Sequence, residues 1–169
     1  MNDNYQILID RLDAFIRKYY KNQLVRGGIY AFTVSLAFYL LVVTFEYFGH
    51  FNTGVRTFMF YTFIIGIGFI VSRFVIIPLM HLYRLGKIIS HEQAAEIIGK
   101  HFSKVQDKLL NVLQLKKQAD ENTSTHPELL LAGINQKIDE LKPVPFISAI
   151  NLNENRKYLR FAVIPLFAL

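Results

Sequence analysis

The fold of this chain is decided by two long apolar runs, GIYAFTVSLAFYLLVVTFEYF (residues 28–48) and FMFYTFIIGIGFIVSRFVIIPLM (residues 58–80). Each has about the 20 residues that a helix needs to cross roughly 30 Å of hydrocarbon. Buried helices of a soluble all-α core are the alternative, but such helices rarely stay apolar on every face over this length. The sequence therefore predicts a transmembrane helical hairpin whose outer loop comprises residues 49–57.

The composition of the 169-residue chain agrees with an all-α membrane protein. Hydrophobic residues make up 52% of it, and the mean hydropathy is +0.26. Because there is no cysteine, disulfides, zinc–thiolate sites and cysteine nucleophiles are excluded. The net charge of +6 fits a nucleic-acid partner as well as a membrane protein with basic cytoplasmic segments. The distribution of the charge has to decide between them.

Residues 1–27 predict a cytoplasmic amphipathic helix without a cleavable signal peptide. Two interpretations of it stand: the helix lies on anionic lipid, or its apolar face packs on the rest of the protein. Basic side chains gather where the chain enters the bilayer and where it returns. The predicted membrane-interface and lipid-contacting residues are Arg17, Lys18, Lys21, Arg26, Arg84 and Lys87.

The charge distribution also predicts the topology. The outer loop carries Arg56 as its clear positive charge, whereas basic residues precede the first run and follow the second. By the positive-inside rule, both ends of the hairpin are cytoplasmic. Residues 81–157 hold eleven Lys or Arg and nine Asp or Glu, and this near balance does not make a nucleic-acid footprint.

Two charges fall within the apolar runs. Glu46 lies in the last turn before the outer interface, whereas Arg73 lies deeper, in the inner half of the second run. An intramembrane charge is costly and suggests a function, but the long side chain of Arg73 can also snorkel towards headgroups or contact a partner subunit. Small residues four apart allow helices to approach closely, and they predict a helix seam formed by Ala31, Ser35, Gly68 and Ser72.

The cytoplasmic segment, residues 81–157, predicts a small bundle of three amphipathic helices. Ser90 and Gln93 form a capping-box pattern at the first, Ser103 is placed to cap the second, and Pro127 begins the third, which KPVPF ends. Such a core is small, so we expect these helices to pack on the membrane helices, on lipid or on a partner. The zinc-binding HExxH pattern fails at Ala95. We find no catalytic, cofactor-binding or metal residues in the sequence, and no small-molecule substrate is identified.

Residues 158–169 predict the start of a third transmembrane helix. Arg156, Lys157 and Arg160 precede an apolar run that begins at Phe161 and has nine residues before the sequence stops. A basic flank followed by an apolar run is typical of a membrane helix that starts on the cytoplasmic side, but nine residues cannot span. We expect its remainder to lie beyond Leu169; a short interfacial helix is the alternative.

The run RLGKIISHEQAAEIIGKHFSKVQDKLLNVLQL (residues 84–115), together with the hairpin and FIRKYYKNQLVRG (residues 15–27), resembles the N-terminal region of a family of large inner-membrane proteins of Bacteroidetes that forms a domain of unknown function. The resemblance covers nearly the whole chain. It implies two membrane helices, a cytoplasmic helical segment, a third membrane helix and a long periplasmic helical region. It implies no reaction and no catalytic residues.

These patterns favour a non-enzymatic anchor or scaffold subunit of a cell-envelope complex in the bacterial inner membrane, with its N-terminus in the cytoplasm. Export of proteins and outer-membrane biogenesis are processes that such a complex would serve. The expected partners are the lipid bilayer and other membrane protein subunits, without nucleic acid. The alternative is a transporter or channel subunit in which Arg73 and Glu46 are functional.

Overall fold

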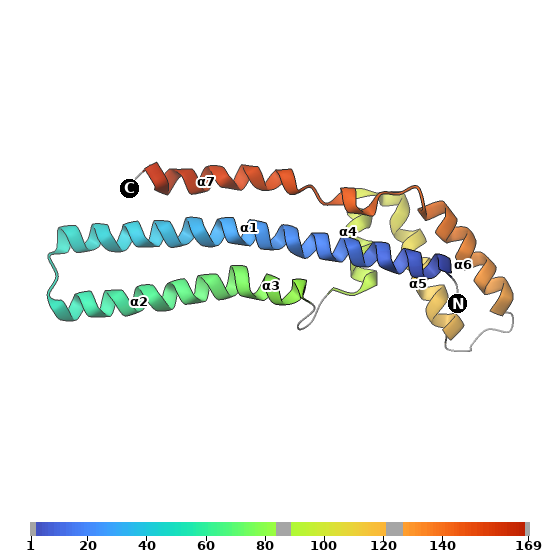
Figure 1. The fold of residues 1–169 in the computed structure, drawn as a ribbon, viewed down its shortest axis with the longest axis horizontal. Coiled ribbons are helices and arrows are strands. Elements are labelled where there is room, and N and C mark those ends of the chain that lie inside the picture. Colours follow the sequence, from blue (N-terminus) through green and yellow to red (C-terminus); the bar gives the residue numbers. More distant parts are fainter. Residues whose placement is uncertain (1–2, 84–88, 121–126, 168–169) are drawn as a thin grey trace. The chain divides into compact units, whose positions relative to one another are not determined.

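The computed structural model describes residues 3–83, 89–120 and 127–167, and over these ranges the chain is helical without strands (Figure 1). The chain divides into two compact units. Unit 1 comprises Met1–Tyr19 and Ile88–Asn151, and unit 2 comprises Tyr20–Lys87 and Leu152–Leu169. The long helix α1 (Asp3–Gly49) contributes its first part to unit 1 and the rest to unit 2.

Unit 1 is a bundle formed by the start of α1 with α4 (His91–His101), α5 (Ser103–Asp120) and α6 (Pro127–Leu141). A 3-10 turn, η2 (Phe146–Ala149), follows α6 and packs on α4. In turn, α5 packs on both α4 and α6. The core of the bundle consists of buried apolar side chains from each of these elements: Leu8, Leu12, Phe15, Ile16, Ala94, Ala95, Ile98, Val105, Leu109, Val112, Leu113, Ile134, Ile138, Leu141, Phe146 and Ile150.

The start of α1 completes this core, which decides between the two interpretations of the N-terminal helix. Leu8, Leu12 and Phe15 are buried, each at 1% exposure or less. Their spacing places them on one helical face, and that face is covered by protein within unit 1. The apolar face of the amphipathic helix is therefore buried in the bundle. The bundle then has four helices, whereas the three short helices alone would have only marginal stability.

Local signals set the helix ends in unit 1. The predicted capping box is confirmed: the Ser90 hydroxyl accepts a hydrogen bond from the Gln93 backbone N–H at 3.2 Å, and the Gln93 side chain accepts one from the Ser90 N–H at 3.0 Å. The helix α6 begins at Pro127 and ends at Leu141, before KPVPF. By contrast, α5 begins at Ser103 itself, which makes this serine the first helical residue rather than the capping residue.

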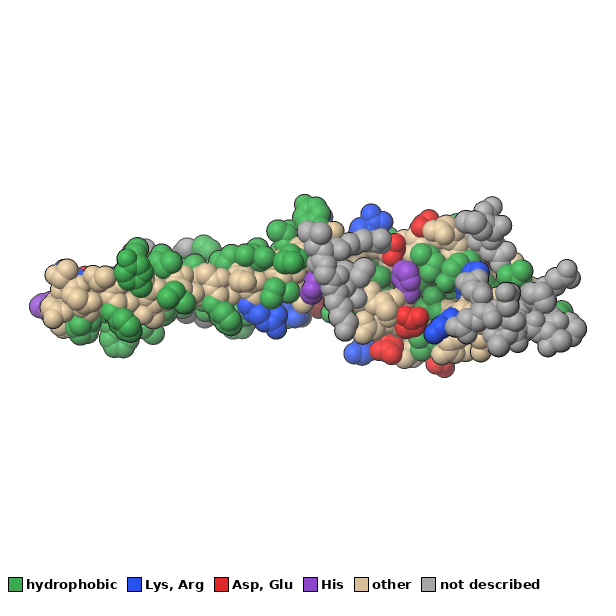
Figure 2. Space-filling view, turned by 90° about the horizontal axis from the view of Figure 1, so that it is seen from below, with side chains coloured by type: hydrophobic (Ala, Val, Ile, Leu, Met, Phe, Trp, Pro, Cys, Tyr) green, Lys and Arg blue, Asp and Glu red, His purple; other side chains and the backbone are tan. Residues whose placement is uncertain are grey.

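Unit 2 contains the rest of α1 and the helix α2 (Thr53–Val71). They belong to two helical stretches, Asn4–Gly49 and Thr53–Leu82, that are long and apolar enough to cross a membrane. Only 6% of the most apolar window of each is buried. Helices of a soluble core would be mostly buried, so these two are suited to lipid. Figure 2, which looks onto the side where α2 lies, shows hydrophobic side chains spread over this surface.

A short link joins α1 to α2. The backbone N–H of His50 still bonds to Glu46 O at 3.2 Å, and His50 takes a positive φ of 44°, as residues that end helices often do. The Asn52 side chain accepts a hydrogen bond from Val55 N at 3.1 Å and so caps α2. Helix α2 thus begins at Thr53, inside the segment 49–57 that the sequence assigns to the outer loop.

The second apolar run does not continue as one regular α-helix. After α2 comes a π-helical turn, η1 (Ser72–Ile76), and then α3 (Ile77–Leu82). Pro78 explains the change, because it has no N–H to donate to the carbonyl of Phe74 and its ring crowds that carbonyl. The chain accommodates the proline by widening the turn before it, as π-bulges do.

Unit 2 also contains the 3-10 turn η3 (Leu152–Asn155) and α7 (Arg156–Phe167). Asn155 Nδ2 donates to Asn22 Oδ1 on α1 at 2.6 Å, and the rings of Tyr158 and Tyr30 lie 5.2 Å apart. Because residue numbers rise together at these two contacts, the segment from η3 into the start of α7 follows α1 in the same direction. The described part of α7 is too short to span, so the third membrane helix stays a prediction.

Candidate functional site

A cavity of about 210 Å³ lies in unit 2 where α1 meets the π-helical turn. Its position is set by the closest approach of the two helices. A β-carbon added to Gly27 would lie 2.1 Å from the carbonyl oxygen of Phe74, so only glycine fits there. The Phe74 carbonyl is the group that Pro78 leaves without its usual helical donor, and the Cα–H of Gly27 faces it.

Two arginines share this cavity. Arg26 lines it from α1 and Arg73 lines it from η1, with the side chains of Gln23 and Tyr30 beside them. In the sequence, Arg73 lies inside the second apolar run. In the structure, the contact of Gly27 with Phe74 places Arg73 level with Arg26, at the basic end of the first run.

No carboxylate compensates these two arginines within the part of the chain that the structure describes. The carboxylates of unit 2 are Glu46 and Glu154. Glu46 is engaged at the other end of α1, where the Arg56 side chain pairs with it at 3.1 Å. The described basic residues of unit 2 other than Arg56 are Lys21, Arg26, Arg73, Arg156, Lys157 and Arg160.

The two charged levels lie about one hydrocarbon thickness apart. From Gly27 to Glu46 there are 19 residues of helix, or about 28 Å at 1.5 Å each. The two apolar stretches between these levels, residues 28–45 of α1 and 58–72 of the second run, carry no charge. Hydrocarbon is roughly 30 Å thick, so an uncharged band of bilayer dimensions separates Glu46 and Arg56 from Arg26 and Arg73.

Arg26 also contacts α7. Its guanidinium carbon lies 5.8 Å from the centre of the Tyr158 ring, within the range of a cation–π interaction. Tyr30 is in turn 6.3 Å from the Phe74 ring, centre to centre. The three helical segments α1, η1 and α7 therefore meet around Arg26 and Tyr30, and α7 arrives beside the cavity with its basic N-terminal residues.

The predicted seam of small residues is corrected at one position. Ala31 is buried, and Ser35 and Ser72 are half-buried. Gly68, however, is exposed, and a β-carbon there would meet nothing within 4 Å. The glycine that meets the other helix is Gly66, because its β-carbon would lie 2.8 Å from the Phe38 ring. When a helix is apolar on every face, the spacing of its small residues does not show which face packs against the neighbouring helix.

The predicted lipid-contacting residues divide between the two units. In unit 1, Arg17 is exposed and Lys18 donates to the Ile147 carbonyl at 2.8 Å, so Lys18 helps to hold η2. In unit 2, Lys21 and Arg26 are exposed on α1. Arg84 and Lys87 lie outside the described residues.

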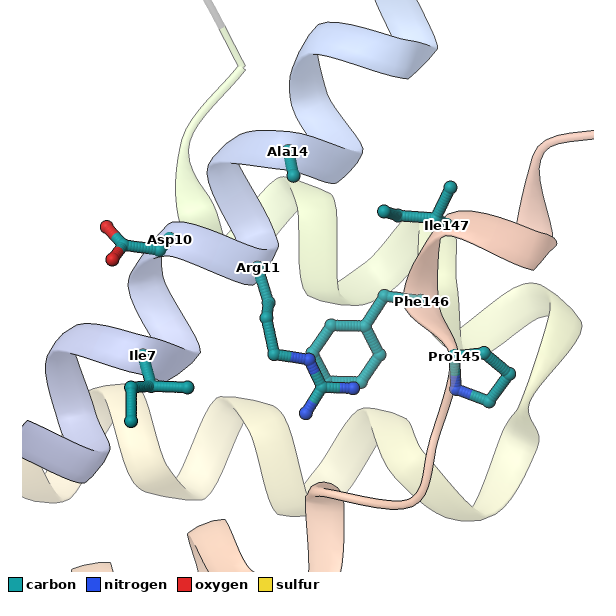
Figure 3. A pocket seen from close by; sticks show the side chains of 7 residues that line it. All are labelled: Ile7, Asp10, Arg11, Ala14, Pro145, Phe146 and Ile147. Carbon is teal, nitrogen blue, oxygen red and sulfur yellow. The ribbon is translucent and has the colours of Figure 1, made fainter.

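A second cavity, of about 340 Å³, lies in unit 1 between the start of α1 and η2. Figure 3 shows the Arg11 side chain reaching across it over the Phe146 ring, with the guanidinium carbon 4.4 Å from the ring centre. Arg11 donates to the carbonyls of Leu141 and Val144. Partial burial lowers the pKa of Arg11 from its ordinary value. Arg11 therefore secures the end of α6, and it is one of the two charged residues, with Asp10, that line this cavity.

Sequence reasoning missed Arg11, Gln23, Gly27 and Tyr30. A signal for Gly27 existed, since a glycine at the end of a membrane helix is typical of close helix approach. Among the described residues, no group of three or more His, Cys, Asp or Glu side chains is arranged to hold a metal ion. Comparison of the chain with protein-family models, curated proteins and solved structures finds no match.

Proposed function

We propose that this protein is a non-enzymatic membrane anchor and scaffold subunit of a cell-envelope complex in the bacterial inner membrane. The observation that carries the proposal is the uncharged band between the two charged levels of unit 2. Exposed apolar side chains cover this band, and only lipid or other membrane helices offer them a favourable surface. The helices α1 and α2 then form a transmembrane hairpin.

The charges support an orientation with the Arg26 level on the cytoplasmic side. That level carries Lys21, Arg26 and Arg73, whereas at the other level the charge of Arg56 is paired with Glu46. The positive-inside rule places the more basic end in the cytoplasm. Both segments of unit 1 join the chain at this end, so unit 1 is cytoplasmic as well, and α7 begins its course from the same side.

A scaffold role is supported by the apolar cavity of unit 1. Ile7 and Ile147 line this cavity and are each about half exposed, at 48% and 47%. A folded helical bundle with an apolar opening is suited to contact another protein.

The transporter alternative depended on Arg73 and Glu46 acting within the bilayer. The contacts of unit 2 place them at opposite ends of the uncharged band, each beside another arginine. Between them, the two runs carry no charged residue that could relay an ion. No specific observation favours transport over anchoring.

Single-cysteine labelling tests the membrane placement, because the chain has no native cysteine. A membrane-impermeant maleimide applied to the outer face should label His50→Cys, and Lys21→Cys should react only after the membrane is permeabilised. Ile65→Cys, in the exposed middle of α2, is the matched control and should stay unreactive to a water-soluble reagent. Equal labelling of all three positions in intact membranes would contradict the proposal.

Affinity purification in mild detergent after crosslinking tests the scaffold role. A photoreactive side chain at Ile147 should capture a defined partner, whereas one at Arg17, exposed in unit 1 but outside the cavity, should not. If the protein always elutes alone, with no crosslinked species, the scaffold role in a complex would be contradicted. The membrane-anchor role would not be affected by that result.

A further inference from the structure

The cavity beside the π-helical turn concentrates positive charge in a small space. Arg26 and Arg73 both line it, and none of its lining residues is acidic. Neither arginine makes an ion pair with a described carboxylate. Two positively charged residues that line one cavity repel each other, and this repulsion grows near a low-dielectric medium. The cavity therefore favours an anion that both can bind.

The donors in the cavity fit a phosphate group. Arginine presents a planar set of N–H donors that matches phosphate oxygens in bidentate pairs. A cation–π contact between Arg26 and the Tyr158 ring does not use up the N–H donors of the guanidinium as an ion pair would. The Tyr30 hydroxyl and the Gln23 amide offer further donors. At about 210 Å³ the cavity is below the roughly 300–1,000 Å³ usual for sites of whole small molecules, so it suits one headgroup.

The position of the cavity indicates where the phosphate comes from. Gly27 and Phe74 lie at the boundary of the uncharged band, which is the level of lipid headgroups if the proposed membrane placement holds. Basic pockets between membrane helices on the cytoplasmic side are known to bind anionic headgroups. We propose that the phosphate of an anionic phospholipid binds in this cavity between Arg26 and Arg73. This inference rests on the proposed function.

Native mass spectrometry of the full chain in neutral detergent tests the site. Phosphatidylglycerol should remain bound at concentrations at which phosphatidylcholine does not. Arg73→Gln should weaken the binding on the order of tenfold, because one set of charge-assisted hydrogen bonds is lost. The affinity of Arg73→Lys for phosphatidylglycerol should lie between those of the unchanged chain and Arg73→Gln, since lysine keeps the charge but not the bidentate geometry.

Lys21→Gln is the matched control. Like Arg73→Gln it removes one positive charge from the basic end of unit 2, but Lys21 lies on α1 and does not line the cavity. We expect phosphatidylglycerol binding by this variant to stay within about twofold of the unchanged chain, because exposed charges contribute little through solvent. An equal loss in Lys21→Gln and Arg73→Gln would show a diffuse positive surface and would overturn the site. Equal retention of the two lipids by the unchanged chain would overturn it too.

Glycerol 3-phosphate distinguishes a lipid from a free phosphate. Added to the complex, it should displace phosphatidylglycerol only at far higher concentration, because it lacks the acyl chains that the bilayer-facing helices hold. Displacement at equal concentration would overturn the lipid as the source. Flotation with vesicles of phosphatidylcholine alone measures membrane insertion separately. A chain that floats but shows no headgroup preference would refute this inference and leave the anchor proposal intact.

Discussion

At the scale of single residues, unit 2 depends on how closely α1 and the second apolar run approach. Gly27 is buried against the Phe74 carbonyl, which Pro78 leaves without its usual i+4 helical donor. The adjacent Gly28 has open space where a β-carbon would lie. Two neighbouring glycines of the same helix therefore have different structural roles. Only Gly27 determines which residues of α1 lie beside which residues of the second run.

Gly27→Ala should push α1 away from η1, because its methyl group would lie 2.1 Å from the Phe74 oxygen. Overpacking of this kind costs about 1–3 kcal/mol. In the cysteine-free chain, crosslinking between Phe38→Cys and Phe63→Cys, whose native rings lie 5.5 Å apart, should then become slower. Gly28→Ala is the matched control and should leave the rate unchanged. Equal rates in both variants would show that the Gly27 contact does not hold the helices.

A second residue-scale effect concerns pH. A hydrogen bond from Ser90, then one from its own backbone N–H, lowers the pKa of Glu92 at the start of α4. Because the folded pKa lies below the unfolded one, this stabilisation is complete above about pH 4.3 and is lost as pH falls through the folded pKa. Hydrogen exchange in α4 should therefore quicken as pH falls below about 4, after correction for intrinsic rates.

Glu92→Gln should reduce that acid response, because the side chain no longer titrates. Glu96→Gln is its control on the same helix, since Glu96 is an exposed carboxylate that makes no hydrogen bond or ion pair with a described residue. An acid response that is unchanged in Glu92→Gln, or lost equally in both variants, would contradict the assignment.

At the scale of elements, caps and breakers decide where the helices of unit 1 begin and end. A reciprocal capping box fixes the start of α4, and Arg11 satisfies carbonyls at the end of α6. The same helix end leads into η2, whose Ile147 carbonyl accepts from Lys18. The start of α1 thus contributes apolar area to the bundle and also binds the backbone of the segment that follows α6.

Ser90→Ala should destabilise unit 1 by about 1 kcal/mol, within a usual range of 0.5–2 kcal/mol for a lost N-cap. Thermal unfolding in detergent, followed by hydrogen exchange in α4, measures this loss. Ser103→Ala is the matched control. Ser103 begins α5 without a side-chain hydrogen bond to any described residue, so its replacement should stay within about 0.5 kcal/mol. A larger effect at Ser103 than at Ser90 would reverse the assignment of the caps.

At the scale of the whole molecule, the chain combines a helical bundle with helices suited to lipid, and α1 takes part in both. The two units are stabilised differently. Unit 1 buries apolar side chains in protein, whereas the helices of unit 2 leave theirs exposed. Substitutions in the two units should therefore affect different measurements, one the stability of a folded bundle and the other the insertion into a bilayer.

Phe15→Ala should destabilise unit 1 by about 3–5 kcal/mol, because Phe15 is fully buried. Limited proteolysis should then cut α4, α5 and α6 more rapidly, while flotation with lipid vesicles stays unchanged. Ile7→Ala on the same helix is the control, since Ile7 is half exposed. Loss of flotation together with the bundle would show that the two units do not fold independently.

Much of the fold can be predicted from the sequence because its signals are local. The length of the apolar runs predicts membrane helices, and Ser90 with Gln93 predicts the start of α4 in the structure. Pro127 and KPVPF likewise mark the ends of α6. The lipid-suited helices and the helical segment that follows them can be predicted from composition and period alone. Their orientation in a membrane remains a prediction.

The site depends on contacts between residues far apart in the chain, which the sequence could not supply. The start of α1 packs in the bundle because it completes a core that three short helices leave too small. Arg73 reads as a charge deep in an apolar run, yet it lies level with Arg26. The sequence by itself determined which segments are helical and which suit lipid. Only the tertiary structure decided the level of each charge along the hairpin. The reason is that the backbone of α1 approaches the second run at Gly27, and the residue of the second run that it meets there is Phe74.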